Sequence, residues 1–120
     1  MKILIVDDSR AMRLIVMRAL RQAGFGDHTL VEAADGAEAL ALIQDSAPDL
    51  VLSDWNMPKM SGIDLLRALH EKHLMVKFGF VTSEVTAETK QMALDTGALF
   101  LITKPFTVDA FKEALTCLAA

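Results

Sequence analysis

Two adjacent aspartates follow an apolar run near the start of the chain. Residues 2–8 read KILIVDD, so Asp7 and Asp8 come directly after four aliphatic residues that favour a dry environment. A third carboxylate, Asp54, ends the apolar run LVLSD. Carboxylates about 4 Å apart repel each other by about 4 kcal/mol at an effective dielectric constant near 20. A fold that gathers these three groups therefore needs a counter-charge.

Two further polar groups also stand at the ends of apolar runs. Thr82 ends GFVT, and Lys104 follows LFLIT. Three carboxylates with one ammonium group leave two formal negative charges, which a divalent cation would neutralise. All-oxygen ligands favour a hard ion, and Mg²⁺ commonly binds one or two carboxylates together with waters and phosphate oxygens. We interpret the aspartate pair as half of a cation site.

Alternating strand and helix patterns would bring these residues together. The expected strands are 2–7, 29–33, 50–54, 77–82 and 99–103, and the expected helices lie near 10–23, 36–46, 62–72, 85–96 and 107–118. Strict alternation indicates an α/β fold with a parallel sheet covered on both faces. In such a sheet the reactive crevice lies beyond the carboxyl ends of the strands. The candidate residues all fall at those ends.

The helix boundaries carry their own signals. Asp35 with Glu38 and Ser61 with Asp64 have the spacing of capping boxes. A glycine follows the first and the fourth helix, where a left-handed residue often ends a helix.

Length and composition indicate one domain over residues 1–120. The chain is 52% hydrophobic, and its apolar runs are shorter than the ~20 residues of a membrane span. No signal peptide is visible, and the single cysteine, Cys117, excludes an internal disulfide. The net charge is −4 without a long basic run, which argues against direct binding of nucleic acid. We expect a cytoplasmic monomer that does not bind a membrane.

Four segments resemble the signatures of the response-regulator receiver domain. They are VDDSR, SDWNMPKMSG, VTSE and TKPFT, and the resemblance covers the whole chain. It implies the CheY-like, flavodoxin-like fold, a doubly wound five-stranded parallel sheet in the order 2-1-3-4-5. It also implies a cis peptide bond between Lys104 and Pro105.

The resemblance further implies roles for the candidate residues. Asp54 would accept a phosphoryl group from a histidine kinase or a phosphotransfer protein. Asp8 and Asp54 would bind Mg²⁺ through their carboxylates, Asn56 would bind it through its backbone carbonyl, and Asp7 would act through a coordinated water.

Two more residues of the family would respond to the phosphoryl group. Lys104 would pair with a phosphoryl oxygen, and Thr82 would turn its hydroxyl onto another and so report the modification. Asn56 and Glu84 would set the rate of dephosphorylation. The protein would then be no enzyme beyond promoting its own phosphorylation and dephosphorylation, and an unknown output protein would bind the phosphorylated form.

Other functions fit the sequence less well. A receiver module from a longer regulator with a DNA-binding or enzymatic output domain remains an alternative. An aspartate-nucleophile phosphatase would carry a second aspartate two residues after its nucleophile on the first strand, and DDS lacks that spacing. A flavin carrier is disfavoured because the glycine-free turn DDSRA is acidic and would repel a flavin phosphate.

The first helix has apolar residues on two sides. Its expected buried face consists of Met12, Ile15, Val16, Ala19, Leu20 and Ala23. Leu14 and Met17 are expected on the opposite, exposed face among Arg10, Arg13 and Arg21. In the family this helix commonly docks against the phosphodonor, so we expect Leu14 and Met17 to contact that partner.

The last strand departs from the family pattern. Receivers often carry an aromatic residue three positions before the strand-five lysine, and here that position is Leu101. Phe100 is one residue earlier, and successive strand residues face opposite sides of a sheet. We therefore expect an output surface formed by the fourth helix, the last strand and the last helix, without the rotation of an aromatic ring.

Overall fold

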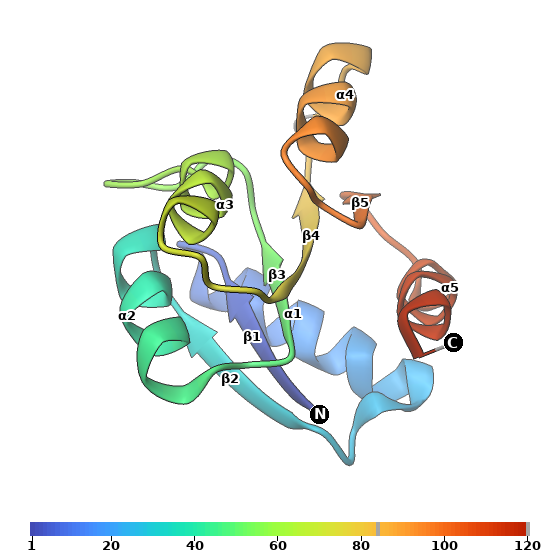
Figure 1. Cartoon of the computed structure of the whole chain (residues 1–120). Coiled ribbons are helices and arrows are strands. Elements are labelled where there is room, and N and C mark those ends of the chain that lie inside the picture. Colours follow the sequence, from blue (N-terminus) through green and yellow to red (C-terminus); the bar gives the residue numbers. More distant parts are fainter. Residues whose placement is uncertain (84, 120) are drawn as a thin grey trace.

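Five parallel strands form one sheet in the order β2-β1-β3-β4-β5 (Figure 1). The computed structural model describes residues 1–83 and 85–119, of which the side chains of 117–119 are not described. The strands are β1 (Lys2–Val6), β2 (Thr29–Ala33), β3 (Leu50–Ser53), β4 (Lys77–Thr82) and β5 (Phe100–Thr103). The helices are α1 (Arg10–Leu20), α2 (Gly36–Ser46), α3 (Gly62–Glu71), α4 (Ala87–Asp95) and α5 (Val108–Ala119), and a π-helical turn, η1 (Arg21–Phe25), extends α1.

This architecture confirms the predicted fold class and strand order. The Lys104–Pro105 peptide bond is cis, as expected. Two strands end one residue earlier than predicted, at Val6 and Ser53, so Asp7 and Asp54 stand just beyond the sheet. None of the helices in the described part of the chain is both long and apolar enough to cross a membrane.

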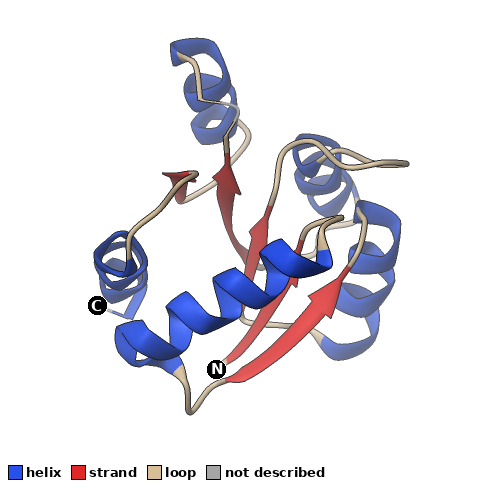
Figure 2. Cartoon of the chain, turned by 180° about the vertical axis from the view of Figure 1, so that it is seen from behind, coloured by secondary structure: helices blue, strands red, loops and turns tan. Residues whose placement is uncertain are grey.

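Helices cover both faces of the sheet. α1 and α5 lie on one face, where Figure 2 shows α1 crossing the strands, and α2, α3 and α4 lie on the other. Alternate residues of β1 supply the two cores: Ile3 and Ile5 face α1 and α5, whereas Leu4 and Val6 face α2 and α3. Because both faces are buried, the strands are apolar at nearly every position.

Short polar side chains begin the helices that lead away from the strand ends. Ser9 Oγ accepts a hydrogen bond from the Met12 amide at 3.2 Å, and Ser61 Oγ accepts one from Asp64 at 3.2 Å. Asp35 Oδ1 accepts one from Glu38 at 2.8 Å, and this backbone donor lowers the pKa of the Asp35 carboxyl. These N-caps confirm the predicted helix starts. The full reciprocal capping box occurs instead at the start of α4, between Thr86 and Thr89.

The orientation of α1 differs from the prediction. Met17 is buried, with 9% of its surface exposed, whereas Ile15 is 49% exposed beside the equally exposed Leu14. The buried face is therefore rotated toward β2, where Arg13 pairs with Glu32. The helical pattern alone could not show this, because both Ile15 and Met17 border the apolar face and only the position of β2 decides between them.

Gly62, the first residue of α3, lies against the backbone of the strand-end loop. Its amide donates to Trp55 O at 2.8 Å, and a Cβ on Gly62 would lie 2.1 Å from the carbonyl oxygen of Asp54. No side chain fits there without moving the loop that carries Asp54. The glycine thus fixes the distance between α3 and the end of β3.

We predict that Gly62→Ala destabilises the protein, because the added methyl group overlaps backbone atoms that cannot rotate away. The expected loss in the free energy of unfolding is about 1–3 kcal/mol, as for other overpacked sites. Gly26→Ala is the matched control. At Gly26 the backbone is helical and a Cβ would have its nearest neighbour at 3.5 Å. Urea unfolding of both variants tests this, and equal stability of the two would contradict it.

Candidate functional site

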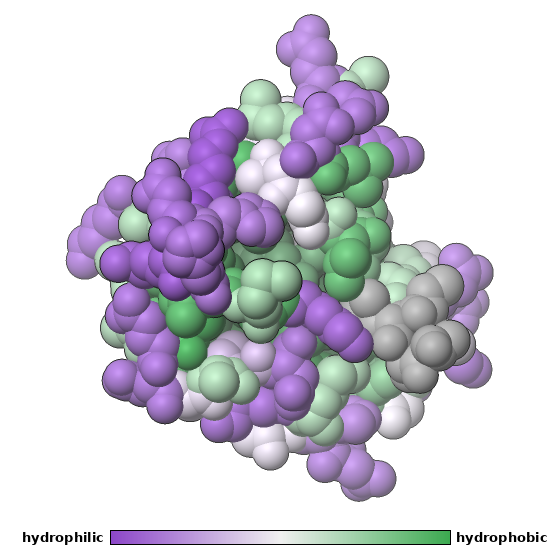
Figure 3. Space-filling view, viewed as in Figure 1, coloured by the Kyte–Doolittle hydropathy of each residue, from purple (hydrophilic) through white to green (hydrophobic). Residues whose placement is uncertain are grey.

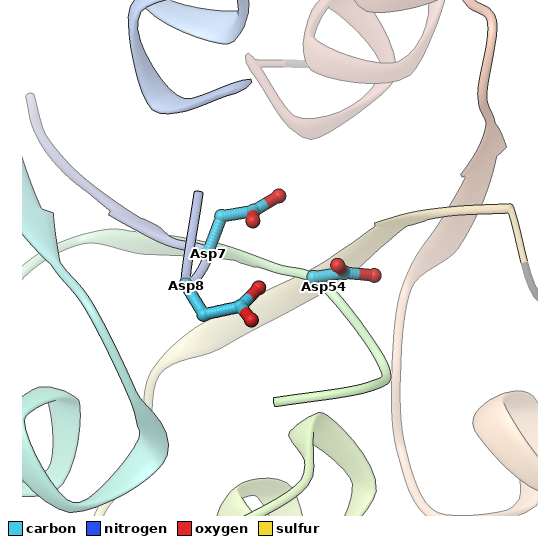
Figure 4. Close-up of side chains that lie close together, drawn as sticks. All are labelled: Asp7, Asp8 and Asp54. Atoms are coloured by element: carbon cyan, nitrogen blue, oxygen red, sulfur yellow. The ribbon is translucent and has the colours of Figure 1, made fainter. Parts of the chain in front are cut away.

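Three carboxylates meet at the carboxyl ends of two adjacent strands. Asp7 and Asp8 follow β1, and Asp54 follows β3. Each offers an oxygen atom that lies within 4.8 Å of those of the other two. Figure 4 shows the three side chains lying close together, with Asp7 and Asp8 side by side and Asp54 across from them. The predicted gathering of like charges is therefore present in the fold.

Lys104 supplies a positive charge to this group of carboxylates. Its Nζ lies 2.9 Å from Asp7 Oδ2 and 3.3 Å from Asp54 Oδ2. The lysine side chain is only 14% exposed, so little water screens these two ion pairs. Lys104 thus joins the ends of β1, β3 and β5.

The amide, the carbonyl and the carboxylate of Asp7 all make hydrogen bonds. Its amide donates to Ala33 O at 3.1 Å, and its carbonyl accepts from Arg13 Nη1 at 2.7 Å. Its carboxylate accepts from the Ser9 amide at 2.9 Å and from Lys104. Asp8 is exposed and makes no such contact with any described residue. Asp8 is therefore the carboxylate that is most available to a ligand.

Asp54 is partly buried and fixed through the backbone. Its amide donates to Val6 O at 2.9 Å, and its Oδ1 accepts from the Trp55 amide at 2.7 Å. The Trp55 ring is buried against Phe80, with ring centroids 4.8 Å apart. A change at the Asp54 carboxylate is thus one hydrogen bond away from the only tryptophan of the chain.

The remaining predicted residues lie around this centre. Thr82 is fully buried at the end of β4, and its carbonyl accepts from the Lys104 amide at 3.0 Å. Asn56 is exposed in the loop after β3. Glu84 lies outside the described residues.

The donor set fits a hard divalent cation. Three carboxylates within 4.8 Å, one of them exposed, provide oxygen ligands and an excess of negative charge over Lys104. Mg²⁺ binds such groups and keeps several of its waters. Asp8 could hold the ion without losing a hydrogen bond to a described residue, whereas the carboxylates of Asp7 and Asp54 both contact Lys104 and a backbone amide.

Sequence patterns did not identify the role of Arg13. It was predicted on the solvated face of α1, but its side chain is only 13% exposed and is bound to Glu32 and to the Asp7 carbonyl. The sequence placed Arg13 and Met17 on the same side of the helix, but the burial of that side is visible only in the structure. It depends on which side of α1 faces β2.

Comparisons with known proteins agree with this geometry. The chain is 42% identical to the chemotaxis protein CheY of Pseudomonas aeruginosa, over 96% of this chain and 93% of that protein. It is 44% identical to the chemotaxis protein CheY-3 of Vibrio cholerae, over 96% and 88% of the two chains. The solved structure of Vibrio cholerae CheY4 superposes with a TM-score of 0.84 at 34% identity, over 97% of this chain and 96% of that one.

The family match spans nearly all of the fold. The sequence model of the response regulator receiver domain covers residues 3–116, from the first core residue of β1 into α5. That range includes Asp7, Asp8 and Asp54, which together form the acidic centre. The chain therefore belongs to the response regulator receiver domain family.

Proposed function

We propose that the protein is a phosphorylation-dependent switch in which Asp54 accepts a phosphoryl group from the histidine of a kinase or phosphotransfer protein. The observation that carries this proposal is the pairing of Lys104 with both Asp7 and Asp54 beside an exposed third carboxylate. A carboxylate oxygen of Asp54 would attack phosphorus, the bond from phosphorus to the histidine nitrogen would break, and the nitrogen would keep the electron pair. The product would be an acyl phosphate.

Catalysis of this transfer would rest on position and charge. Phosphoryl transfer needs little covalent help from a protein beyond alignment and neutralisation of the equatorial oxygens. Lys104 Nζ lies 3.3 Å from Asp54 Oδ2, so it could contact a phosphoryl oxygen on Asp54 with a small movement. Mg²⁺, held by Asp8, Asp54 and the Asn56 carbonyl, with Asp7 acting through a bound water, would supply the remaining positive charge.

The protein would promote its own modification and its own dephosphorylation and act on no other substrate. Its acyl phosphate would be hydrolysed by water at the exposed side of the site, near Asn56. Chemotaxis-like signalling is the supported class of pathway, because the two relatives described above are chemotaxis proteins.

The output surface would lie at α4, β5 and α5. Figure 3 shows apolar side chains near α4 and β5, and Leu94 of α4 is exposed. A hollow between β5 and α5 is lined by Phe100, Phe106 and Ala114, among others. Thr82 is buried one strand away from β5, in register with Thr103. Leu101 packs toward the α3 and α4 side and Phe100 toward the α5 side, which supports the expectation that Phe100 does not replace the missing aromatic residue. Coupling would therefore proceed by repacking around Leu101.

The phosphodonor would dock on α1 beside the acidic centre. The exposed aliphatic pair is Leu14 and Ile15, in place of the predicted Leu14 and Met17. Arg10 is exposed at the start of α1, and Arg21 is exposed at the start of η1, which extends it. An acidic helix surface with an apolar stripe would match these residues.

Replacing Asp54 with Asn should abolish phosphorylation. In the parent protein, a small phosphodonor with Mg²⁺ should add one phosphoryl group, detected by mass spectrometry. Asp64→Asn, which alters an exposed carboxylate on α3, should keep full labelling. Undiminished labelling of the Asp54 variant would refute Asp54 as the acceptor.

Mg²⁺ should stabilise the parent and not Asp8→Ala. At a free concentration 100 times its dissociation constant, a single bound ion raises the free energy of unfolding by about 2.7 kcal/mol. Without the ion, Asp8→Ala should be more stable than the parent, because one of three repelling charges is removed. Asp27→Ala, an exposed carboxylate before β2, should behave as the parent. Thermal unfolding with and without Mg²⁺ measures both effects, and a parent insensitive to Mg²⁺ would contradict the site.

Charged replacements of Leu14 and Ile15 should slow transfer from a protein donor only. For each of Leu14→Glu and Ile15→Glu we expect a loss of about tenfold, which corresponds to about 1.4 kcal/mol. Met75→Glu is the matched control, because Met75 is 92% exposed but precedes β4, at the opposite edge of the sheet. Stopped-flow measurements with a phosphotransfer protein and with a small donor separate docking from chemistry. Equal slowing with both donors would indicate a damaged site instead.

A further inference from the structure

The Arg13 side chain is charged and almost buried, and the proposed phosphoryl transfer does not explain its contacts. Its Nε donates to Glu32 Oε1 at 2.9 Å and its Nη1 donates to the Asp7 carbonyl at 2.7 Å. The arginine side chain is 13% exposed and Glu32 is 37% exposed. One guanidinium therefore connects α1, the end of β1 and β2.

Arg13 contacts Asp7 one residue beyond the end of β1, where regular strand pairing stops. β1 ends at Val6, but the Asp7 amide still donates to Ala33 O of β2 at 3.1 Å. The Asp7 carbonyl accepts from Arg13 instead of from a neighbouring strand. Arg13 thus fixes the plane of the peptide that links Asp7 to Asp8.

This peptide plane determines where two of the three carboxylates stand. The Asp7 side chain is held independently by Ser9 and Lys104. Asp8 has no equivalent contact with the described residues, so its position depends on the backbone that carries it. A rotation of the Asp7–Asp8 peptide would move the Asp8 carboxylate away from Asp54.

Glu32 holds the guanidinium in the orientation that this contact needs. A planar guanidinium with two fixed acceptors loses its freedom to rotate, which a lysine ammonium would keep. Because Glu32 lies on β2, in register with Ile5 of β1, the acceptor is itself fixed to the sheet. Glu32 also neutralises the charge of Arg13, so the pair adds little net field at the cation site.

We propose that Arg13, oriented by Glu32, is a positioning residue that sets the Asp7–Asp8 peptide and thereby the affinity for the divalent cation. This inference rests on the proposed cation site. Groups behind the ligands of a metal commonly change its affinity by about 10–100-fold when they are removed. Arg13 would act through geometry, without touching the ion or the phosphoryl group.

The test compares Arg13→Met with Arg18→Met. Both variants remove one positive charge from α1, but Arg18 is exposed. We expect Arg13→Met to weaken Mg²⁺ binding, measured by Trp55 fluorescence, at least tenfold, and Arg18→Met to change it less than twofold. In metal-free protein the amide nitrogen shift of Asp8 should move in Arg13→Met and stay unchanged in Arg18→Met, because only the first variant removes the hydrogen bond to the preceding carbonyl.

Two conservative variants separate the effect of Arg13 on the cation site from an effect on protein stability. Arg13→Lys keeps the charge but cannot span both acceptors, so its Mg²⁺ affinity should fall between those of the parent and Arg13→Met. Glu32→Gln keeps a side-chain acceptor of the same length and should weaken the affinity less than Arg13→Met. Urea unfolding without metal reports any loss of stability separately, and Arg13→Lys carries the test if Arg13→Met does not fold.

The outcomes distinguish this inference from the proposed function. A parent that binds Mg²⁺ with an Arg13→Lys or Arg13→Met variant of equal affinity would overturn the role of Arg13 and leave the cation site standing. An unchanged Asp8 amide shift in Arg13→Met would overturn it as well. A parent without any Mg²⁺ response would overturn both.

Discussion

The repulsion among Asp7, Asp8 and Asp54 is the constraint on which the rest of the structure depends. Two like charges about 4 Å apart repel by about 4 kcal/mol at an effective dielectric constant near 20, and each of these carboxylates offers an oxygen within 4.8 Å of the other two. The fold tolerates this repulsion because Lys104 lies between Asp7 and Asp54. Lys104 follows β5, which is two strands away from β3 in the sheet. The charges are thus only partly balanced, and the exposed Asp8 is the group left for a cation.

The elements around the site make this arrangement rigid. Gly62 allows α3 to approach the Asp54 backbone, the Ser9 amide fixes one oxygen of Asp7, and Arg13 fixes its carbonyl. The Gly62 and Arg13 contacts act on the backbone next to a carboxylate, and the Ser9 contact acts on the Asp7 carboxylate itself. A bound ion or phosphoryl group would therefore meet a preorganised set of oxygens, and the energy of binding would be available to move more distant elements such as α4 and β5.

The surfaces proposed for the phosphodonor and for the output protein lie on different elements of the fold. On α1, Leu14 and Ile15 lie beside the acidic centre, which suits a donor that must deliver a phosphoryl group there. On the α4 and β5 side Leu94 is exposed, and this side is linked to Asp54 both through Lys104 after β5 and through the buried end of β4. Donor docking and output would thus use separate faces, so a partner could bind one while the other is occupied.

The sequence by itself determined the alternation of elements, the buried strands and the placing of Asp7, Asp54, Thr82 and Lys104 at strand ends, because these follow from local apolar patterns and from the geometry of parallel sheets. Helix starts such as Ser61 were also predictable, since a cap is a contact between residues three apart. Only the tertiary structure decided which side of α1 is buried and what Arg13 binds. Both depend on the distance between α1 and β2, which are joined by contacts far apart in the chain, and no local pattern records that distance.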